Sequence, residues 1–458
     1  MKNNNVVNDE FILDIKRIGI NGEGIGYYNK KAVFVDGIIP GESANVRITE
    51  AQDKMLKAEI VEMKKTSEYR VEPSCPFYKE CGGCNTMHIA YDYMLKLKKE
   101  IVKESITRYT KLNPRSFEIK DTIPSNNTYY RNKSQLQLVN DNGNTSVSML
   151  KANTNINIPI NDCLCQKELI NKLNNSICKL IDEENISLFD YKTNKGILRY
   201  LIIRVNRKNE ALVDIVTFDD DKVVDILASK IKKLDNVSGV YKSNNRSLKS
   251  GSEIIGTNLT FLVGKEYITE NIGKISYKIY PNTFFQLNTN QAEKMAELVL
   301  KSCKLSFKER VLDAYSGIGL LGLYLAHNAK EVVGIEYNDS SVISANENAK
   351  LNKINNAKFY QGDSGDLLLK LLNDKEYFDV IVVDPPRTGL DNKFIDAIIK
   401  SKAKRIIYVS CNPATLAKNL DVLSEYYNVN SITPMDFFPN TALVESVACL
   451  SLGVLHQK

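Results

Sequence analysis

The sequence predicts an α/β protein that ends in a doubly wound, mostly parallel sheet and begins with a small β-barrel. In residues 281–458, strand-like and helix-like segments alternate, which is typical of a parallel sheet covered by helices. In residues 10–62, short strand-like runs are separated by glycine turns, which is typical of an OB-like barrel. The intervening part, residues 115–280, contains mostly strand-like runs, so we expect a mixed, mostly β central domain.

The length and composition fit a soluble protein of several domains. The chain has 458 residues, of which 43% are hydrophobic and 25% charged, so a sizeable core can form. We expect domains at residues 1–65, 66–280 and 281–458. The net charge of +6 permits a nucleic-acid partner without requiring one. We find neither an apolar stretch as long as a membrane span nor a signal-peptide core, so we expect a cytoplasmic protein that binds no membrane.

The predicted barrel and the helix after it depend on hydrophobic periodicity. Strand-like runs at residues 11–17, 32–35 and 44–48 are interrupted by turn signals such as Asp36-Gly37. Such barrels often bind nucleic acid, and a structural module without a ligand is the alternative. In residues 93–109, apolar side chains recur at the spacing of an amphipathic helix.

A cysteine-rich loop lies between the predicted barrel and this helix. Cys75, Cys81 and Cys84 form the pattern C-x5-C-x2-C, and a fourth thiolate can come from Cys163 or Cys165. Four thiolates fit a tetrahedral zinc ion or an iron–sulfur cluster. We favour a [4Fe–4S] cluster over zinc because three of the ligands come from one loop and one from a distant segment.

A glycine-containing turn in the C-terminal part indicates a nucleotide-binding βαβ unit of the Rossmann-like kind. One strand ends at Asp313, the turn contains Gly317 and Gly319, and a second strand ends at Glu336. Glycines let a ligand approach the backbone, and the acidic residue can accept hydrogen bonds from ribose hydroxyls. The glycine pattern of this turn, which also includes Gly322, fits nicotinamide cofactors as well as S-adenosylmethionine.

One thiol and one carboxylate belong to the same end of the predicted sheet. Cys411 directly follows the strand-like residues 406–410, where open α/β sheets place their active sites. Asp384 ends another strand in the same way, and Glu445 lies in a third apolar run. This combination indicates covalent catalysis. The plainer alternatives are a buried packing cysteine and a solvated strand glutamate.

Together these features resemble the RNA uridine-5-methyltransferase family, close to the iron–sulfur-containing bacterial 23S rRNA (uracil-5-)-methyltransferases with a TRAM domain. The resemblance covers nearly the whole chain. Residues 10–62 resemble a TRAM domain, and the four-cysteine pattern resembles that family's cluster. Ser410-Cys411-Asn412-Pro413 matches the nucleophile motif. Phe438-Pro439-Asn440-Thr441, which leads to Glu445, matches the motif of the general base.

The resemblance implies a set of site residues in an S-adenosylmethionine-dependent methyltransferase domain. Cys411 and Glu445 are the expected catalytic residues. The cofactor is expected at Gln286, Tyr315, Gly317, Glu336, Asp363 and Asp384. The [4Fe–4S] cluster is expected at Cys75, Cys81, Cys84 and Cys163, the last because it begins Cys-x-x-Gln. The chain departs from the family at Leu443, where a histidine is frequent, and at Ser316, where a cysteine is frequent.

The implied reaction transfers a methyl group from S-adenosylmethionine to carbon 5 of a uridine in 23S rRNA. Cys411 would add to carbon 6, and Glu445 would later remove the carbon 5 proton. The target uridine would have to leave its stack. A uridine in a tRNA loop is the alternative substrate, and a monomer is the expected state.

Basic and aromatic residues in the N-terminal half are candidates for RNA contacts. The candidates for the phosphate backbone are Lys96, Lys98, Lys99, Lys103, Arg131, Lys133, Arg199 and Arg204, and for each of them a solvated surface charge is the more common alternative. Tyr129 and Tyr130, beside Arg131, are candidates for base stacking, and core packing is the alternative for both.

Three other classes of protein explain less of the sequence. Radical enzymes that cleave S-adenosylmethionine usually resemble C-x3-C-x2-C on a barrel, which differs from the spacing here. A non-catalytic RNA-binding protein does not need both Cys411 and Glu445. A nicotinamide oxidoreductase does not explain Asp384-Pro385-Pro386-Arg387 together with Cys411.

Overall fold

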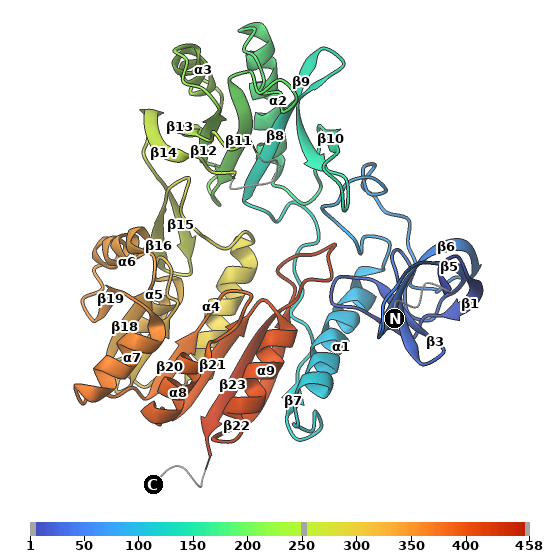
Figure 1. Ribbon diagram of the computed structural model, residues 1–458. Coiled ribbons are helices and arrows are strands. Elements are labelled where there is room, and N and C mark those ends of the chain that lie inside the picture. Colours follow the sequence, from blue (N-terminus) through green and yellow to red (C-terminus); the bar gives the residue numbers. More distant parts are fainter. Residues whose placement is uncertain (1–5, 249–253, 454–458) are drawn as a thin grey trace.

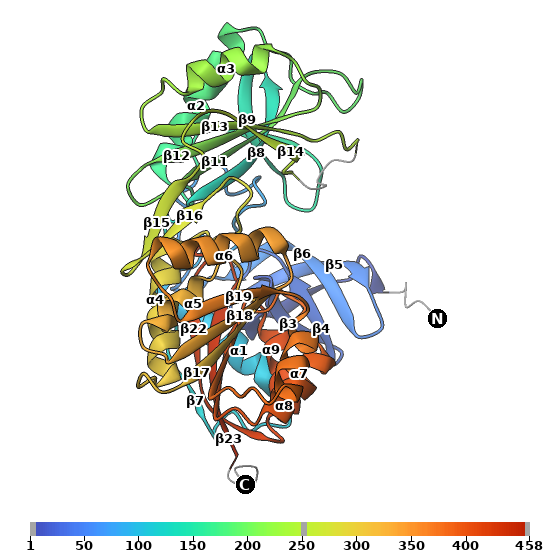
Figure 2. The ribbon, with the colours of Figure 1, turned by 90° about the vertical axis from the view of Figure 1, so that its left-hand side faces the viewer.

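The computed structural model describes residues 6–248 and 254–453. Figure 1 shows three lobes: a blue N-terminal barrel, a green central lobe, and a C-terminal lobe in orange and red that also contains the cyan helix α1 (Tyr91–Tyr109). In Figure 2 the central lobe stands above the C-terminal lobe, and the hairpin of β15 (Ile268–Ile272) and β16 (Ile275–Ile279) lies between them. No helix of these described residues is long and apolar enough to cross a lipid bilayer.

The N-terminal lobe is a six-stranded sheet with the order β1-β5-β6-β4-β3-β2. Its strands are β1 (Glu10–Asp14), β2 (Arg17–Ile18), β3 (Gly24–Tyr28), β4 (Lys31–Val35), β5 (Ser43–Ala51) and β6 (Met55–Lys65). Val33, Val46 and Ile48 are fully buried, while their neighbours along the strands stay partly exposed. This alternation has the two-residue period of a β-strand, and the inward-facing set forms the core of the lobe.

The central lobe is a seven-stranded sheet with the order β10-β9-β8-β11-β12-β13-β14. The strands are β8 (Lys133–Asp141), β9 (Asn144–Leu150), β10 (Asn157–Ile160), β11 (Leu198–Val205), β12 (Ala211–Thr217), β13 (Val237–Asn244) and β14 (Thr257–Gly264). The helices α2 (Glu168–Glu183) and α3 (Val223–Ile231) pack against this sheet in one core. Every residue of the central strands β11 and β12 is buried, including the charged residues Arg199, Arg204 and Asp214.

The C-terminal lobe is an eight-stranded sheet with the order β19-β18-β17-β20-β21-β23-β22-β7. Its strands are β7 (Glu118–Ile119), β17 (Arg310–Ala314), β18 (Glu331–Glu336), β19 (Ala357–Gln361), β20 (Val380–Val383), β21 (Arg405–Ser410), β22 (Tyr427–Met435) and β23 (Glu445–Leu452). Neighbouring strands from β19 to β21 run parallel, and β23 is antiparallel to both β21 and β22. Successive strands are added on one side from β17 to β19 and on the other side from β20 to β21, so the carboxyl ends of β17 and β20 form the switch point of a doubly wound sheet.

Helices cover both faces of this sheet. They are α4 (Thr289–Cys303), α5 (Leu320–Ala326), α6 (Asp339–Leu351), α7 (Ser364–Asn373), α8 (Asn392–Ser401) and α9 (Pro413–Leu423). Residues of α4, α5 and α6 form one apolar core with the sheet, and residues of α1, α8 and α9 form the other. The lobe therefore has three layers.

Two segments that precede residue 281 join the C-terminal lobe. Helix α1 packs beside α9, and Figure 1 shows the two helices next to each other. The two-residue strand β7 adds a parallel edge to β22. The C-terminal lobe therefore also includes residues from the range expected for the central domain.

Four of the eight expected phosphate contacts are wrong, because the structure buries them. Lys98, Lys133, Arg199 and Arg204 are each at most 8% exposed. Arg199 lies among aromatic rings and donates to Asn245, while Lys133 and Arg204 donate to the carbonyls of Pro281 and Thr283. Tyr130 is also buried, and its hydroxyl donates to the carbonyl of Pro439. These polar side chains hold segments of the protein together and cannot reach RNA.

Candidate active site

Cys411 and Glu445 lie opposite each other at one end of the C-terminal sheet. Strands β21 and β23 are antiparallel, and Ser410 is paired with Ser446. Cys411 follows Ser410 at the end of β21 and Glu445 precedes Ser446 at the start of β23, so both residues directly adjoin the last pair of this ladder. The charge of Glu445 acts on the Cys411 thiol, as expected for near neighbours. The fold therefore brings the thiol and the carboxylate together from two different strands.

The turn after Cys411 is held by helix capping. Asn412 is the N-cap of α9, and its side chain accepts a hydrogen bond of 3.0 Å from the backbone N–H of Ala414. Pro413 occupies the first turn of the helix, where a missing N–H has no cost. The Asn412 amide also donates to the carbonyl of Arg387 at 3.1 Å. This ties the Cys411 turn to the loop that follows β20.

Burial dominates the acidity of Glu445. The residue is 8% exposed, and burial raises the pKa of its carboxyl to about 8. The charge of Asp384 acts in the same direction, while Arg387 and Lys98 lower the pKa. A carboxyl whose pKa lies near neutral pH is suited to accept and release a proton.

The Cys411 thiol is weakly acidic in this environment. Its pKa is raised to about 11, first by burial and then by the charges of Glu445 and Asp384, and the charge of Arg387 opposes this shift. Cys411 and Glu445 therefore disfavour each other's negative charge. The thiolate forms more readily when Glu445 is neutral.

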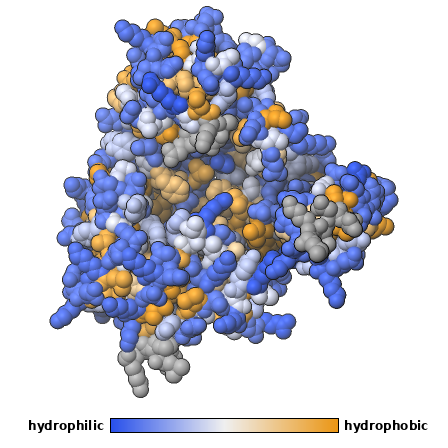
Figure 3. Space-filling model, viewed as in Figure 1, coloured by the Kyte–Doolittle hydropathy of each residue, from blue (hydrophilic) through white to orange (hydrophobic). Residues whose placement is uncertain are grey.

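A cavity of about 1170 Å³ opens between the C-terminal and central lobes, and its lining includes both residues. Figure 3 shows the surface hollowed between these lobes, with hydrophobic side chains in the hollow. The lining contains all eight residues expected for catalysis and cofactor binding: Gln286, Tyr315, Gly317, Glu336, Asp363, Asp384, Cys411 and Glu445. The structure thus gathers them in one place, and their individual roles stay predictions.

The turn between β17 and α5 forms one wall of the cavity. Gly317 has a φ of +54°, and a Cβ atom added there would meet no atom within 4 Å. Its N–H donates to the carboxylate of Glu336 at 2.9 Å, and the N–H of Asn338 donates to the other carboxylate oxygen at 2.8 Å. The turn is therefore held open toward the cavity, and Glu336 is fixed beside it.

Acidic groups line the rest of this wall. Burial raises the pKa of both Asp313 and Asp384 to about 7. The Asp313 carboxylate accepts a hydrogen bond of 2.8 Å from the N–H of Gly322. Asp363 is the N-cap of α7 and accepts from the N–H of Asp366 at 3.0 Å. The cavity thus favours a ligand that donates hydrogen bonds or carries positive charge.

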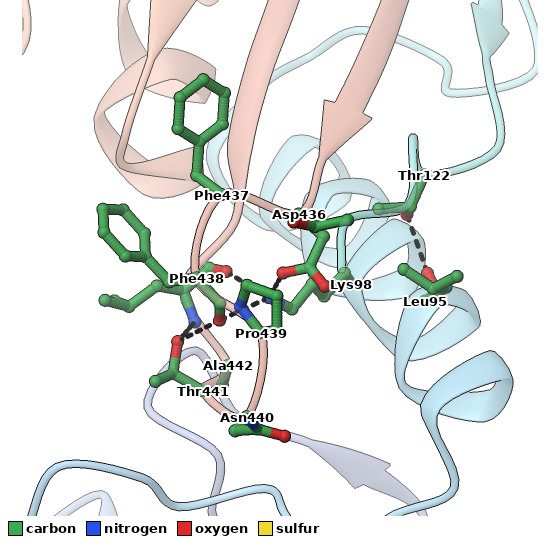
Figure 4. A network of polar contacts seen from close by, with 12 residues as sticks. Leu95, Lys98, Thr122, Asp436, Phe437, Phe438, Pro439, Asn440, Thr441 and Ala442 are labelled. Atoms are coloured by element: carbon green, nitrogen blue, oxygen red, sulfur yellow. Dashed lines mark hydrogen bonds and ion pairs between the residues drawn. The ribbon is translucent and has the colours of Figure 1, made fainter. Parts of the chain in front are cut away.

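A loop of residues 436–443 connects β22 to Glu445 and makes contact with several distant segments. Figure 4 shows Lys98 reaching from α1 to this loop, where its ammonium pairs with Asp436 and donates to the carbonyl of Phe438. Burial lowers the pKa of Lys98, while Asp436 and Glu445 raise it. The Asn440 carbonyl accepts from the N–H groups of Asn85 and Thr86, at 3.0 and 3.1 Å. The 436–443 loop is therefore in contact with both α1 and the cysteine-rich loop.

Sequence reasoning missed several residues of this site. Arg387, Asp313, Phe438 and Leu443 also line the cavity. Arg387 lies in the strand-end motif Asp384-Pro385-Pro386-Arg387, and this position could have predicted that it lines the cavity. Lys98 lies four residues after Met94 and four before Val102, both buried, and this spacing indicates the inner face of the helix.

Some of the cysteines in and around the expected cluster site lie near one another. The Cys84 and Cys165 sulfurs are 3.4 Å apart, and all four expected ligands are free thiols. Burial raises the pKa of Cys75 and Cys81, and the charge of Cys163 raises both further. Across residues 6–248 and 254–453, however, no three His, Cys, Asp or Glu side chains converge as a metal-binding group. The thiol donors suit iron or zinc in kind, but the structure does not show a metal site.

Comparisons with known proteins define the class. A profile of the tRNA (Uracil-5-)-methyltransferase family matches residues 90–452, and a profile of the TRAM domain matches residues 7–61. An uncharacterized RNA methyltransferase of Halalkalibacterium halodurans is 38% identical over 445 residues, which cover 96% of each chain. Another from Listeria monocytogenes is 36% identical over 448 residues, which cover 97% of each chain.

One solved structure has the same architecture over nearly the whole length. It is the tRNA (uracil-54, C5)-methyltransferase of Pyrococcus abyssi in complex with S-adenosyl-L-homocysteine, with a TM-score of 0.76 and 26% identity. The match covers 96% of this chain and 100% of that one. The fold and the relatives define an S-adenosylmethionine-dependent RNA methyltransferase with an N-terminal TRAM domain. The chain belongs to the tRNA (uracil-5-)-methyltransferase family.

Proposed function

We propose that this enzyme methylates carbon 5 of a uridine in RNA through a covalent adduct between Cys411 and carbon 6 of the base. The observation that carries the proposal is that Cys411 and Glu445 face each other across β21 and β23 inside the same cavity as Gly317 and Glu336. A nucleophile, a proton acceptor and a nucleoside-binding turn therefore border one space.

The first step adds the Cys411 thiolate to carbon 6 of uracil. A carbon–sulfur bond forms, and the electrons of the carbon 5–carbon 6 double bond move toward oxygen 4 to give an enolate. Carbon 5, otherwise a poor nucleophile, then carries electron density. Arg387 favours the thiolate because its positive charge lowers the pKa of Cys411.

The second step transfers the methyl group, and the third restores the ring. Carbon 5 takes the methyl group from the sulfonium of S-adenosylmethionine, and S-adenosylhomocysteine leaves. Glu445 then accepts the proton of carbon 5, the double bond re-forms, and the thiolate is expelled from carbon 6. General-base steps of this kind contribute ~10²–10⁴-fold.

Three features of the cavity support the binding of S-adenosylmethionine at Gln286, Tyr315, Gly317, Glu336, Asp363 and Asp384. Gly317 leaves space beside the backbone, and the Glu336 carboxylate can accept from ribose hydroxyls. The acidic side chains of the cavity wall attract the positive charge of the sulfonium group of S-adenosylmethionine. The Pyrococcus relative was crystallised with S-adenosyl-L-homocysteine, the product of such a transfer.

We favour 23S rRNA as the substrate, and a tRNA loop is the second candidate. The four-cysteine pattern is the feature that this chain shares with the iron–sulfur rRNA enzymes that it resembles. The tRNA (uracil-54, C5)-methyltransferase of Pyrococcus favours the second candidate. Cytoplasmic location and a monomeric state stay predictions.

We also propose that Cys75, Cys81, Cys84 and Cys163 bind a [4Fe–4S] cluster. Thiols from two distant segments support this, with Cys165 beside Cys84 as the rival fourth ligand. A bound cluster would supply a rigid cross-link between the segments. Anaerobically purified protein should contain about four iron and four sulfide ions. Cys163→Ala should lose them while Cys165→Ala retains them; loss only in Cys165→Ala would reverse the assignment.

The substrate is tested by mapping 5-methyluridine in 23S rRNA and tRNA from a strain that lacks this gene, with and without re-supplied enzyme. Loss of the methyl group at rRNA positions would support the rRNA assignment. Loss confined to tRNA would move the target and keep the chemistry. The absence of any change would overturn the proposed function.

A further inference from the structure

The ammonium of Lys98 is buried and directed entirely at one loop. Neither Lys98 nor its partner Asp436 has any exposed side-chain area. The Nζ atom also donates to the backbone carbonyl of Phe438 at 3.2 Å and to that of Leu443 at 2.7 Å. An ammonium has three donors, and these three acceptors satisfy all of them. Residues 436, 438 and 443 belong to one short loop, so one side chain of α1 holds both ends of it.

The two carbonyls border the catalytic part of the cavity. Phe438 and Leu443 line the cavity together with Cys411 and Glu445. Glu445 comes two residues after Leu443 and is the first residue of β23. Lys98 therefore fixes the backbone directly before Glu445, and it does so through a carbonyl that is present whatever side chain stands at position 443.

The partner of Lys98 is itself held in place. One Asp436 carboxylate oxygen receives the ammonium, and the other accepts from the Tyr91 hydroxyl at 2.8 Å. The Asp436 N–H donates to the carbonyl of Ile123 at 3.0 Å. Tyr91 and Lys98 both belong to α1, so this helix is the element against which the loop is positioned.

We propose that Lys98 is a positioning residue for proton removal: by holding the 436–443 loop, it keeps the Glu445 carboxylate directed at carbon 5 of the uridine adduct. The inference rests on the proposed function. Cys411 is held separately, by β21 and the α9 cap. Addition and methyl transfer therefore proceed without Lys98, whereas release of the methylated product depends on it.

The test replaces the buried pair with apolar side chains of similar volume, Lys98→Met with Asp436→Leu. Such replacements of buried ion pairs often leave stability unchanged. During turnover with RNA and S-adenosylmethionine, the fraction of enzyme in a denaturant-stable RNA complex should rise about tenfold. Turnover should fall by about the same factor, and the single-turnover rate of methyl transfer should stay within about twofold of wild type. The matched control is Glu104→Met, which replaces an exposed charged side chain of the same helix.

A second variant keeps the test decisive if the apolar pair does not fold. Lys98→Gln with Asp436→Asn retains donors and acceptors of similar size, and it should raise the adduct fraction about threefold. A folded variant with an unchanged adduct fraction would overturn the inference. So would equal loss of methyl transfer and release, because that is the behaviour of a purely structural pair. If Glu445→Gln traps an adduct and the Lys98 variants do not, only this inference fails; if Glu445→Gln traps none, the proposed function fails.

Discussion

Cys411 and Glu445 face each other across β21 and β23, one position beyond the pair formed by Ser410 and Ser446. The two residues are linked by charge as well as by position, since the Glu445 carboxylate is one of the groups that raise the pKa of the Cys411 thiol. The proposed reaction needs the thiol ionised early and the carboxylate ionised late. Because a negative charge on Glu445 disfavours the thiolate, Cys411 should ionise while Glu445 is still protonated, and Glu445 should ionise afterwards.

The acidity of Cys411 should respond to Glu445. Glu445→Gln removes a negative charge beside the thiol, so the pKa of Cys411 should fall below its present value of about 11. The pH dependence of iodoacetamide alkylation at Cys411, followed by mass spectrometry, measures this shift. Glu425→Gln, an exposed position after α9, is the control and should leave the profile unchanged. An unchanged profile in Glu445→Gln would show that the charge of Glu445 does not affect the pKa of Cys411.

Turnover should rise with pH through the pKa of Glu445 when proton removal limits the rate. Only the ionised carboxylate accepts the carbon 5 proton, and burial raises this pKa to about 8. We expect kcat to increase between about pH 6.5 and pH 9 and the adduct fraction to decrease over the same range. A kcat that is flat across this range, with substrate saturating, would contradict Glu445 as the base.

The same raised pKa predicts how stability depends on pH. The folded protein keeps the Glu445 proton to about pH 8, whereas an unfolded glutamate releases it near 4.3. The folded state therefore binds more protons in this window, and its stability falls as pH rises. Glu445→Gln removes this dependence, so its Tm advantage over wild type should grow between about pH 5 and pH 8. If the Tm difference between Glu445→Gln and the wild type stayed constant or shrank over this range, the pKa of Glu445 would not be raised by burial.

Binding of S-adenosylmethionine should be sensitive to a side chain at position 317. Gly317→Ala strains a backbone with a φ of +54° and places a methyl group in open space of the cavity wall. We expect about tenfold weaker binding in calorimetry. Gly37→Ala is a matched control, because its φ is +76° and its surroundings are also open, yet it lies in the N-terminal barrel. If Gly317→Ala and the wild type bound S-adenosylmethionine with equal affinity, the cofactor would not bind against this turn.

Local patterns sufficed for the elements that position the site. The turn that contains Gly317 and Gly319 and the strand that ends at Glu336 were predicted from the sequence, and both are present in the structure. Strongly apolar strands and a glycine turn into a helix carry their own signal. The polar residues at strand ends could be predicted to gather, because parallel strands share one edge.

Contacts between distant segments could not be predicted in this way. The spacing of Lys98 indicates the inner face of its helix, but no local pattern shows that Asp436, far away in the sequence, is its partner. The joining of α1 to the C-terminal sheet depends on tertiary packing, which no local period reports. The same holds for the cysteines, whose sequence pattern is compatible with a cluster without fixing which sulfurs meet.

The most direct test of the covalent mechanism is mass spectrometry of Glu445→Gln after incubation with substrate RNA and S-adenosylmethionine. After denaturation and digestion, the peptide that contains Cys411 should carry a methylated uridine nucleotide, and Cys411→Ser should yield neither adduct nor product. If Glu445→Gln released 5-methyluridine at the wild-type rate with no modified peptide, Glu445 would not be the base. Methylation by Cys411→Ser at the wild-type rate would contradict the covalent step itself.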